Sequence, residues 1–265
     1  MTEQTNINTS NNNISVTSPP LKNGLDQNLL KYLAMFFMVL NHIGFIFLSD
    51  HIISDLLIGL GHFTFPTLCY FLVEGFMYTS DRKKYALRLL VFALISQIPF
   101  SIAFAPDGKI FNFSGLNVLF TLFICFLMIW GLMSVKSSLM RLLIFGAAFG
   151  LSYFCDWGLT APIFTLIFLW AYGNKKNLKI GFLIILLLSI LDYLLSSTAL
   201  GGEYVFSVYG LFSSISGFIL SGIALIWLYE GKRNNKHKQF NKWFFYIFYP
   251  AHLLILGVIR IILYC

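Results

Sequence analysis

The amino-acid sequence predicts an all-α protein, a polytopic bundle of about nine transmembrane helices whose N-terminus lies in the cytoplasm. Hydrophobic residues make up 58% of the chain and charged residues only 11%, whereas soluble domains contain about 25% charged residues. The chain contains repeated apolar runs that approach the roughly 20 residues a helix needs to cross a bilayer. Its Lys and Arg residues gather in alternate connections between these runs, which is typical of a membrane protein with one fixed orientation.

Residues 1–27 differ from the rest because they are rich in Asn, Ser and Thr and show no apolar period. We expect them to form a disordered cytoplasmic tail. They contain no charged segment that leads into a short apolar core, which argues against a signal peptide. Residues 28–265 then form a single transmembrane domain, which leaves no room for a separate soluble module.

The apolar runs follow the tail in order. The first, residues 29–48, spans roughly 30 Å as a helix, which matches the hydrocarbon thickness of a bilayer. After a connector at 49–61 with a weakly apolar patch, further runs are separated by turns and charged connections: residues 62–79, 85–104, 116–133, 139–154, 159–172, 180–195, 204–229 and 243–263. Pro250 should kink the last run, because proline cannot donate a hydrogen bond to the Tyr246 carbonyl.

Charge fixes the predicted orientation. The connections after the second, fourth, sixth and eighth runs, with the tail and the adjoining helix ends, hold every Lys and Arg except Lys109 and Arg260. The opposite connections and helix ends hold acidic residues: Asp50, Asp55, Asp107, Asp156, Asp192 and Glu203. By the positive-inside rule, the basic side faces the cytoplasm and the C-terminus lies outside. The net charge of +7 therefore reflects cytoplasmic loops and gives no reason to expect a nucleic-acid partner.

His42 is the candidate catalytic residue. It lies within the first apolar run, in the half that the charge pattern places towards the outside. An ionisable side chain in a span costs several kcal/mol unless it is paired or faces a wet cavity. Histidine can take and return a proton near neutral pH, so we expect His42 to act as a general base. The structural alternative is a histidine that only hydrogen-bonds the backbone of a neighbouring helix.

Other polar residues lie in the outer half or near mid-membrane, and they should converge inside the bundle because lipid-facing positions hold them poorly. We expect five to bind a substrate: Asn41, His62, Asn117, Asp156 and His252. Asp156, or Asp192, would orient His42 or bind a cationic amine, with a solvated turn residue as the alternative. For His62 the alternative is a wet interfacial histidine, and for His252 a packing histidine.

Glu74 and Arg88 lie near the inner ends of consecutive antiparallel helices, where an ion pair with a structural role could form. Arg88 also forms a basic cytoplasmic mouth with Tyr85, Lys83 and Lys84. A guanidinium suits phosphate groups because it can donate two parallel hydrogen bonds. The alternative is ordinary positive-inside charge.

The sequence gives no sign of a metal site. Its cysteines, Cys69, Cys125, Cys155 and Cys265, have no paired spacing. No CxxC, Walker A, GxGxxG or HExxH motif occurs, so we expect no metal.

Four stretches carry a family resemblance: LLKYLAMFFMVLNHIG (29–44), FPTLCYFLVEGFMYTSDRKKYALRLLVFALISQIPF (65–100), NVLFTL (117–122) and FYIFYPAHLLIL (245–256). In these stretches the chain resembles the TraX family of integral membrane proteins, named for a conjugation-system protein that N-acetylates pilin. The resemblance implies acetyl-CoA as donor and a functional histidine in the first span, which is His42. The family's Glu-Gly, Tyr…Arg and Tyr-Pro-x-His positions correspond to Glu74-Gly75, to Tyr85 with Arg88 as donor-binding residues, and to Tyr249-Pro250 with His252.

The chain departs from the family at two positions. The family commonly has Asp-His where this chain has Asn41-His42, and Arg before the Phe-Pro motif where this chain has His62. An orienting role towards His42 would then need another acid, such as Asp156.

The resemblance and the residues together predict a multi-pass acyltransferase of the plasma membrane. It would transfer an acetyl group from acetyl-CoA to an exported acceptor, such as pilin or another peptide, a lipid or a glycan. The alternatives are a transporter or flippase for a small anion or lipid, and a structural assembly partner. Transporters often show repeated halves, and no internal repeat occurs here.

Overall fold

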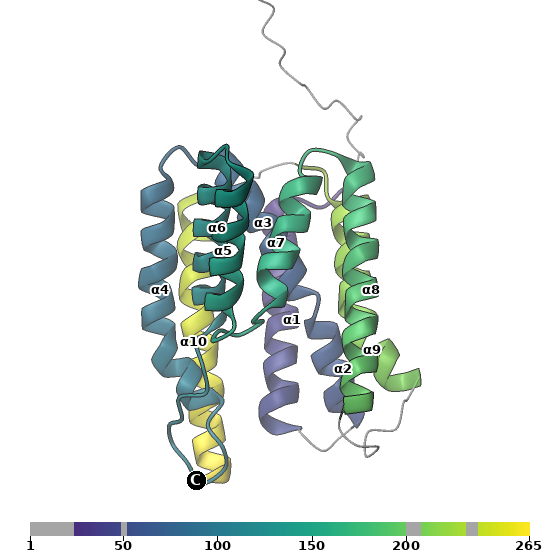
Figure 1. The fold of residues 1–265 in the computed structure, drawn as a ribbon. Coiled ribbons are helices and arrows are strands. Elements are labelled where there is room, and N and C mark those ends of the chain that lie inside the picture. The colour runs from purple at the N-terminus through teal and green to yellow at the C-terminus, as the bar shows by residue number, and fades with distance from the viewer. Residues whose placement is uncertain (1–23, 49–51, 200–207, 232–237) are drawn as a thin grey trace, which may run out of the picture.

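The structure is a computed structural model that describes residues 24–48, 52–199, 208–231 and 238–265 (Figure 1). Within these ranges the chain is helical and has no β-strand, only two isolated bridges, which confirms the predicted all-α class. The helices are α1 (Gln27–Phe47), α2 (Ile52–Gly61), α3 (Thr64–Tyr78), α4 (Arg82–Ala103), α5 (Val118–Ser134), α6 (Ser138–Ser152), α7 (Thr160–Ala171), α8 (Lys175–Ala199), α9 (Val208–Ile223), the π-helical turn η1 (Ala224–Leu228) and α10 (Lys238–Tyr264).

Among the described residues, six helical segments are long and apolar enough to cross a membrane. These segments are Gln27–Phe47, Ile53–Tyr78, Arg82–Ala103, Lys175–Leu195, Val208–Leu228 and Gln239–Tyr264. The apolar helices α5, α6 and α7 have 17, 15 and 12 residues, which is short for a full crossing. Every predicted run therefore coincides with a helix where the structure describes it, but three of these helices fall below the length of a span.

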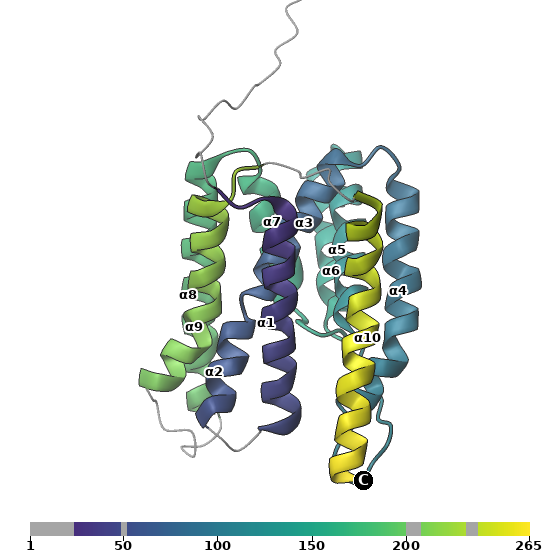
Figure 2. The same ribbon diagram turned by 180° about the vertical axis from the view of Figure 1, so that it is seen from behind.

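The short helices sit at one end of the bundle (Figures 1 and 2). Helices α5, α6 and α7 contact one another there, while α1, α4 and α10 extend past them towards the other end. Helices α1 and α10 start at the same end as the short helices, and the C-terminus lies at the opposite end. The start of α5 and the turn between α6 and α7 consequently lie part-way along the bundle, and this places polar residues deep inside it.

The prediction of a connector at 49–61 is wrong where the structure describes it, because residues 52–61 form helix α2. Helices α2 and α3 form one broken span, with His62 at the break and Pro66 in the first turn of α3, where proline is tolerated. The His62 N–H still donates to the Gly59 carbonyl at 3.1 Å, so the backbone turns without leaving the bundle.

Residues 24–27, which the sequence assigned to the tail, belong to the fold. The Leu25 N–H donates to the Leu228 carbonyl at 2.8 Å. The Asp26 carboxylate accepts the Leu29 N–H at 2.8 Å and caps the N-terminus of α1. The predicted disorder of residues 1–23 lies outside the described residues, as do Asp50 and Glu203.

Arg260, an exception to the charge pattern, is buried with only 2% of its surface exposed. Its guanidinium donates to the carbonyls of Ile102, Pro106 and Lys109 at 3.2, 3.1 and 2.6 Å. These bonds join the last turns of α10 to the end of α4 and to the loop that follows. A buried cation is tolerated here because three acceptors replace its hydration.

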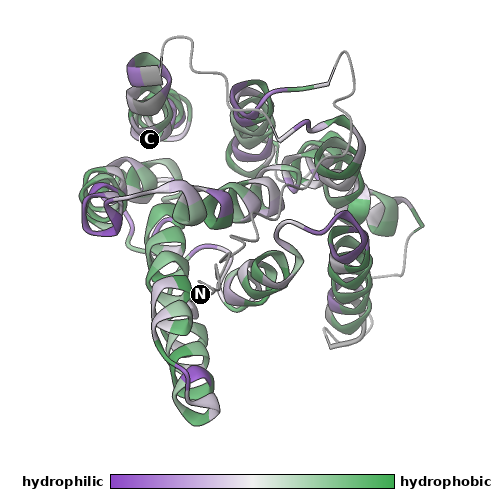
Figure 3. Ribbon diagram, turned by 90° about the horizontal axis from the view of Figure 1, so that it is seen from above, coloured by the Kyte–Doolittle hydropathy of each residue, from purple (hydrophilic) through white to green (hydrophobic). Residues whose placement is uncertain are grey.

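The outer surface of the bundle is apolar. Figure 3, which views the bundle from above, shows hydrophobic residues along the helices on all sides. Large side chains such as Leu139, Leu142 and Ile262 are more than half exposed. An exposed apolar surface of this extent is unfavourable in water and suits contact with lipid. The fold is that of a membrane-embedded helical bundle.

Candidate functional site

Two cavities lie inside the bundle, in opposite halves. The first, about 520 Å³, is lined near the starts of α1, α4 and α10 by Gln27, Lys31, Tyr85, Arg88 and Tyr246, among others, and we call it the charged cavity. The second, about 420 Å³, is lined by Asn41, His42, His62, Asp156 and Trp157, among others, and we call it the histidine cavity. Most of the polar residues that the sequence singled out lie at one or the other.

His42 is paired with His252. Both side chains are buried, and His42 Nδ1 lies 2.9 Å from His252 Nε2. The second nitrogen of His252, Nδ1, lies 2.9 Å from the Phe248 carbonyl oxygen, one turn earlier on α10. The Phe104 and His42 rings pack edge to face at a centroid distance of 5.3 Å. The sequence placed His252 among the substrate-binding residues, and the structure places it behind His42.

The hydrogen-bond network assigns the protons of this pair. A carbonyl oxygen only accepts, so His252 Nδ1 must donate to Phe248. In a neutral His252, Nε2 then carries the lone pair and accepts the proton of His42 Nδ1. His42 Nε2 is left with its lone pair, which is the form required of a general base. The backbone carbonyl of Phe248 thus fixes the tautomer of His42 through His252.

Asn41 and His62 line the same cavity and are each held by a backbone carbonyl. The Asn41 Nδ2 donates to the Ile58 carbonyl at 3.0 Å and joins α1 to α2. An ionised aspartate could not make this bond because it has no proton to donate. His62 Nδ1 lies 2.8 Å from the Ser214 carbonyl, so the hydrogen bond joins the α2–α3 break to α9.

Asp156 lies at the histidine cavity because its backbone is tied to the start of α5. Its N–H donates to the Leu116 carbonyl at 2.7 Å, and its own carbonyl accepts the Thr121 hydroxyl at 2.6 Å. The next residue, Trp157, adopts a left-handed backbone conformation with φ of 61°. The Trp157 ring stacks on Phe65 at a centroid distance of 4.3 Å. The turn is therefore a fixed part of the cavity wall.

Asn117 does not line either cavity, although the sequence grouped it with the substrate-binding residues. It is fully buried and caps α5, with its Oδ1 accepting the Leu119 N–H at 3.0 Å. Its Nδ2 donates to the Ala93 carbonyl and to Gln97 Oε1 at 2.8 and 2.9 Å. These bonds fix where α5 begins inside the bundle.

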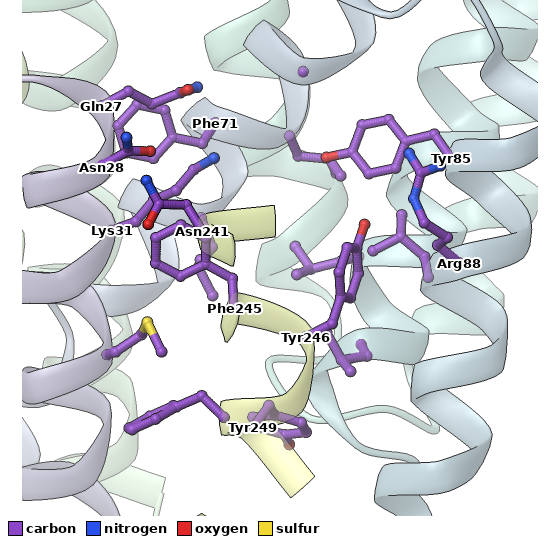
Figure 4. Close-up of a pocket in the computed structure, with 18 of the residues that line it drawn as sticks. Gln27, Asn28, Lys31, Phe71, Tyr85, Arg88, Asn241, Phe245, Tyr246 and Tyr249 are labelled. Carbon is purple, nitrogen blue, oxygen red and sulfur yellow. The ribbon is translucent and has the colours of Figure 1, made fainter. Parts of the chain in front are cut away.

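Tyr85 and Arg88 lie together on one wall of the charged cavity, and Lys31 faces them from α1 (Figure 4). The Arg88 guanidinium lies 5.6 Å from the centre of the Tyr85 ring, and its buried Nε has no hydrogen-bond partner in the described part of the chain. The Lys31 Nζ lies 5.4 Å from the ring centres of both Phe71 and Phe245. Two cations and several aromatic rings therefore surround the cavity.

The basic mouth predicted from the sequence is smaller than expected, because Lys83 and Lys84 do not line the cavity. Lys84 is exposed and lies 3.0 Å from the Asp81 carboxylate. Hydrogen bonds from the Lys84 backbone N–H and side chain lower the pKa of Asp81. This pair caps α4 at the surface.

Glu74 has hydrogen-bond partners other than the one suggested by the sequence. Its buried carboxylate accepts from Gln27 Nε2 at 2.6 Å and from the Tyr229 hydroxyl at 2.7 Å. The carboxylate therefore links α3 to the start of α1 and to the residue after η1. Among the ion pairs of the described residues, none joins Glu74 to Arg88, so the suggested pair is not formed.

Sequence reasoning missed three residues of these networks: Lys31, Gln27 and Tyr229. Lys31 could have been found, because it is a cation inside the first apolar run, where the cost argument that singled out His42 also applies. Gln27 and Tyr229 carry no such signal, since both lie at the edge of a run and become buried only when the helices pack.

Comparison with known proteins identifies the family. The family model described as "TraX protein" matches residues 26–260. The chain is also similar to the "Probable fimbrial assembly protein FimC, serogroup H1" of Dichelobacter nodosus, with 35% identity over 239 residues that cover 86% of this chain and 92% of the relative. No solved structure matches the chain. The match over residues 26–260 includes both cavities, and the chain belongs to the TraX family.

Proposed function

We propose that the protein is an acetyltransferase of the plasma membrane that moves an acetyl group from acetyl-CoA to an acceptor outside the cytoplasm. In this proposal the nine helical runs all cross or enter the bilayer, and the charged cavity opens towards the cytoplasm. The observation that carries the proposal is the His42–His252 pair, a buried base of fixed tautomer at the wall of a cavity.

The charged cavity suits the donor. Its volume of about 520 Å³ falls within the roughly 300–1,000 Å³ of small-molecule sites. Lys31 and Arg88 stand on opposite walls and would bind phosphate groups. The Arg88 Nε has no hydrogen-bond partner in the described ranges, so it is a donor still to be satisfied. The donor supplies the acetyl thioester. Tyr85 and Phe245 give the flat apolar surfaces on which a ring can stack.

The histidine cavity would receive the acceptor. His42 Nε2 takes the proton from the attacking amine or hydroxyl of the acceptor. The acceptor nitrogen or oxygen then forms a bond to the acetyl carbon, and the bond between this carbon and the thioester sulfur breaks. His42 then returns the proton to the departing thiolate, so that it ends the cycle neutral. His252 stays neutral throughout and holds the His42 ring by accepting its Nδ1 proton. Asp156, in the same cavity, would bind an acceptor that arrives as an ammonium group, and this group releases one proton to water before the neutral amine attacks.

The acceptor is, in this proposal, an exported subunit of a surface appendage. The support is the name of the relative, a probable fimbrial assembly protein, together with the position of the histidine cavity in the half of the bundle that the charge pattern predicts to face outwards. Mass spectrometry of surface proteins from cells with and without this chain tests the proposal. A subunit that loses the mass of one acetyl group when the chain is deleted supports it, and identical surface proteins in both strains contradict it.

The transporter alternative retains one observation, which is that the two cavities lie in opposite halves of the bundle. It differs in its outcome, because a transporter changes where a solute is found and leaves the surface subunits chemically unchanged.

A further inference from the structure

The two cavities share a wall. Four side chains line both of them: Met38, Leu68, Val118 and Tyr249. Each comes from a different helix, α1, α3, α5 and α10. Because the same side chains face both spaces, the wall is only one side chain thick. We call these four residues the partition.

The partition lies directly beside the histidine pair. Met38 is one helical turn before His42 on α1, and Tyr249 packs against His252 at a ring-centroid distance of 5.6 Å. In Figure 4, Tyr249 lies at the end of the charged cavity away from Gln27 and Asn28. A group that passed the partition from the charged cavity would therefore arrive next to the candidate base.

Tyr249 is the polar member of the partition. Only 3% of its surface is exposed, and its hydroxyl lies beside the backbone of Val118, another residue of the partition. The hydroxyl can donate to a carbonyl oxygen.

The backbone beside Tyr249 is suited to movement. Pro250 follows within α10 and has no N–H to donate to the Tyr246 carbonyl. The helix therefore lacks one of its hydrogen bonds at the turn that carries Tyr249, and such sites are common positions for kinks and local adjustment. Of the other three partition residues, Met38 is unbranched and flexible, Leu68 branches only at Cγ, and Val118 is β-branched and keeps one side of the partition rigid.

We propose that the partition is a gate between the two cavities, and that it opens to admit the acyl end of the donor to His42. This inference rests on the proposed function for the identity of the group that passes, namely an acyl thioester. The gate itself follows from the shared wall. While closed, it keeps the interior from becoming a continuous leak across the membrane.

Cysteine accessibility tests the gate without any requirement for acetyl transfer. In a variant whose four natural cysteines are replaced by alanine, Ser114→Cys places a reporter thiol at the histidine cavity. A membrane-impermeant maleimide is applied from the charged-cavity side. We expect no labelling of the reporter thiol when Tyr249 is intact or replaced in Tyr249→Phe. In Tyr249→Ala or Met38→Ala, we expect the thiol to be labelled at the rate seen when the reagent is applied from the other side. Phe168→Ala, a buried aromatic truncation outside both cavities, is the matched control and should not open the path.

Two results would overturn the gate: labelling from the charged-cavity side while Tyr249 is intact, or no labelling in both Tyr249→Ala and Met38→Ala. The acyl cargo is tested separately with Tyr249→Trp, which overfills the gate and should lower kcat while acetyl-CoA still binds. An unchanged kcat would overturn the passage of the acyl group. If accessibility behaves as expected but the wild type transfers no acetyl group, the proposed function fails while the gate stands.

Discussion

His42 Nδ1 and His252 Nε2 lie 2.9 Å apart, and the Phe248 carbonyl oxygen lies 2.9 Å from the other nitrogen of His252. With these contacts, no carboxylate is needed to orient the His42 ring. The neutral His252 ring, whose own proton is held by the Phe248 carbonyl, accepts the His42 Nδ1 proton that a carboxylate would otherwise accept. This arrangement gives a physical reason why asparagine can stand at position 41, where the Asn41 amide joins α1 to α2.

The first prediction concerns His252. His252→Ala should slow acetyl transfer by up to the roughly 10²–10⁴-fold that a general base supplies, since His42 loses the partner that fixes its tautomer. His252→Gln still offers an oxygen to His42 Nδ1 and should retain more activity than His252→Ala. The measurement is the transfer rate in membranes at equal protein level. A His252→Ala variant that keeps the wild-type rate would show that His252 has no positioning role.

The second prediction concerns the cations of the charged cavity. Lys31→Gln and Arg88→Gln should each raise the KM for acetyl-CoA and leave accumulation in the membrane normal, because each removes a charge that would bind phosphate. Lys84→Gln is the matched control, since Lys84 is exposed, pairs with Asp81 and does not line the cavity. A KM that rises equally in Lys84→Gln would point to a general effect of surface charge instead.

The third prediction tests whether Tyr229 or Arg88 is the partner of Glu74. Tyr229→Phe should destabilise the protein by about 1.5–3 kcal/mol, the usual worth of a hydrogen bond to a charged group. Combined with Glu74→Gln, the loss should be less than the sum of the two, because both changes act on the same hydrogen bond. Thermal unfolding in detergent measures each variant. The stability losses of Glu74→Gln and Arg88→Gln should instead add in the double mutant. A double mutant that is more stable than this sum would support the ion pair suggested by the sequence.

The fourth prediction is the topology. A cysteine at Gly108 should react with an impermeant reagent in intact cells, and one at Lys136 should react only after the cells are opened. Both residues are exposed, and they lie in the α4–α5 and α5–α6 connections. The reason is the distribution of Lys and Arg between the two sides. The reverse labelling pattern would invert the orientation and place the histidine cavity on the cytoplasmic side.

The sequence predicted the helices well because an apolar run of this length has one stable outcome in a membrane. It failed at residues 52–61, where a short apolar patch reads equally as a connector or as half of a broken span. The break at His62 depends on contacts with α9, such as the hydrogen bond to Ser214, which are distant in sequence.

The sequence predicted which residues belong to the candidate site better than it predicted which residues they contact. His42 and Arg88 stood out because charge or polarity inside a span is costly. Their partners could not be read from spacing, since His252 and His42 are 210 residues apart and Tyr229 and Glu74 are 155 apart. Asn117 showed the same polar signal as the cavity residues, yet its side chain caps α5.

The most direct test of the central claim is acetyl transfer by His42 variants. Radiolabelled acetyl-CoA is added to inverted membranes that contain the acceptor, and the label moved to protein is counted. His42→Ala and His42→Gln should both accumulate normally and lose about 10²–10⁴-fold in rate, because neither can cycle a proton. Full activity of His42→Ala, or a largely active His42→Gln beside a poorly accumulating His42→Ala, would contradict the account.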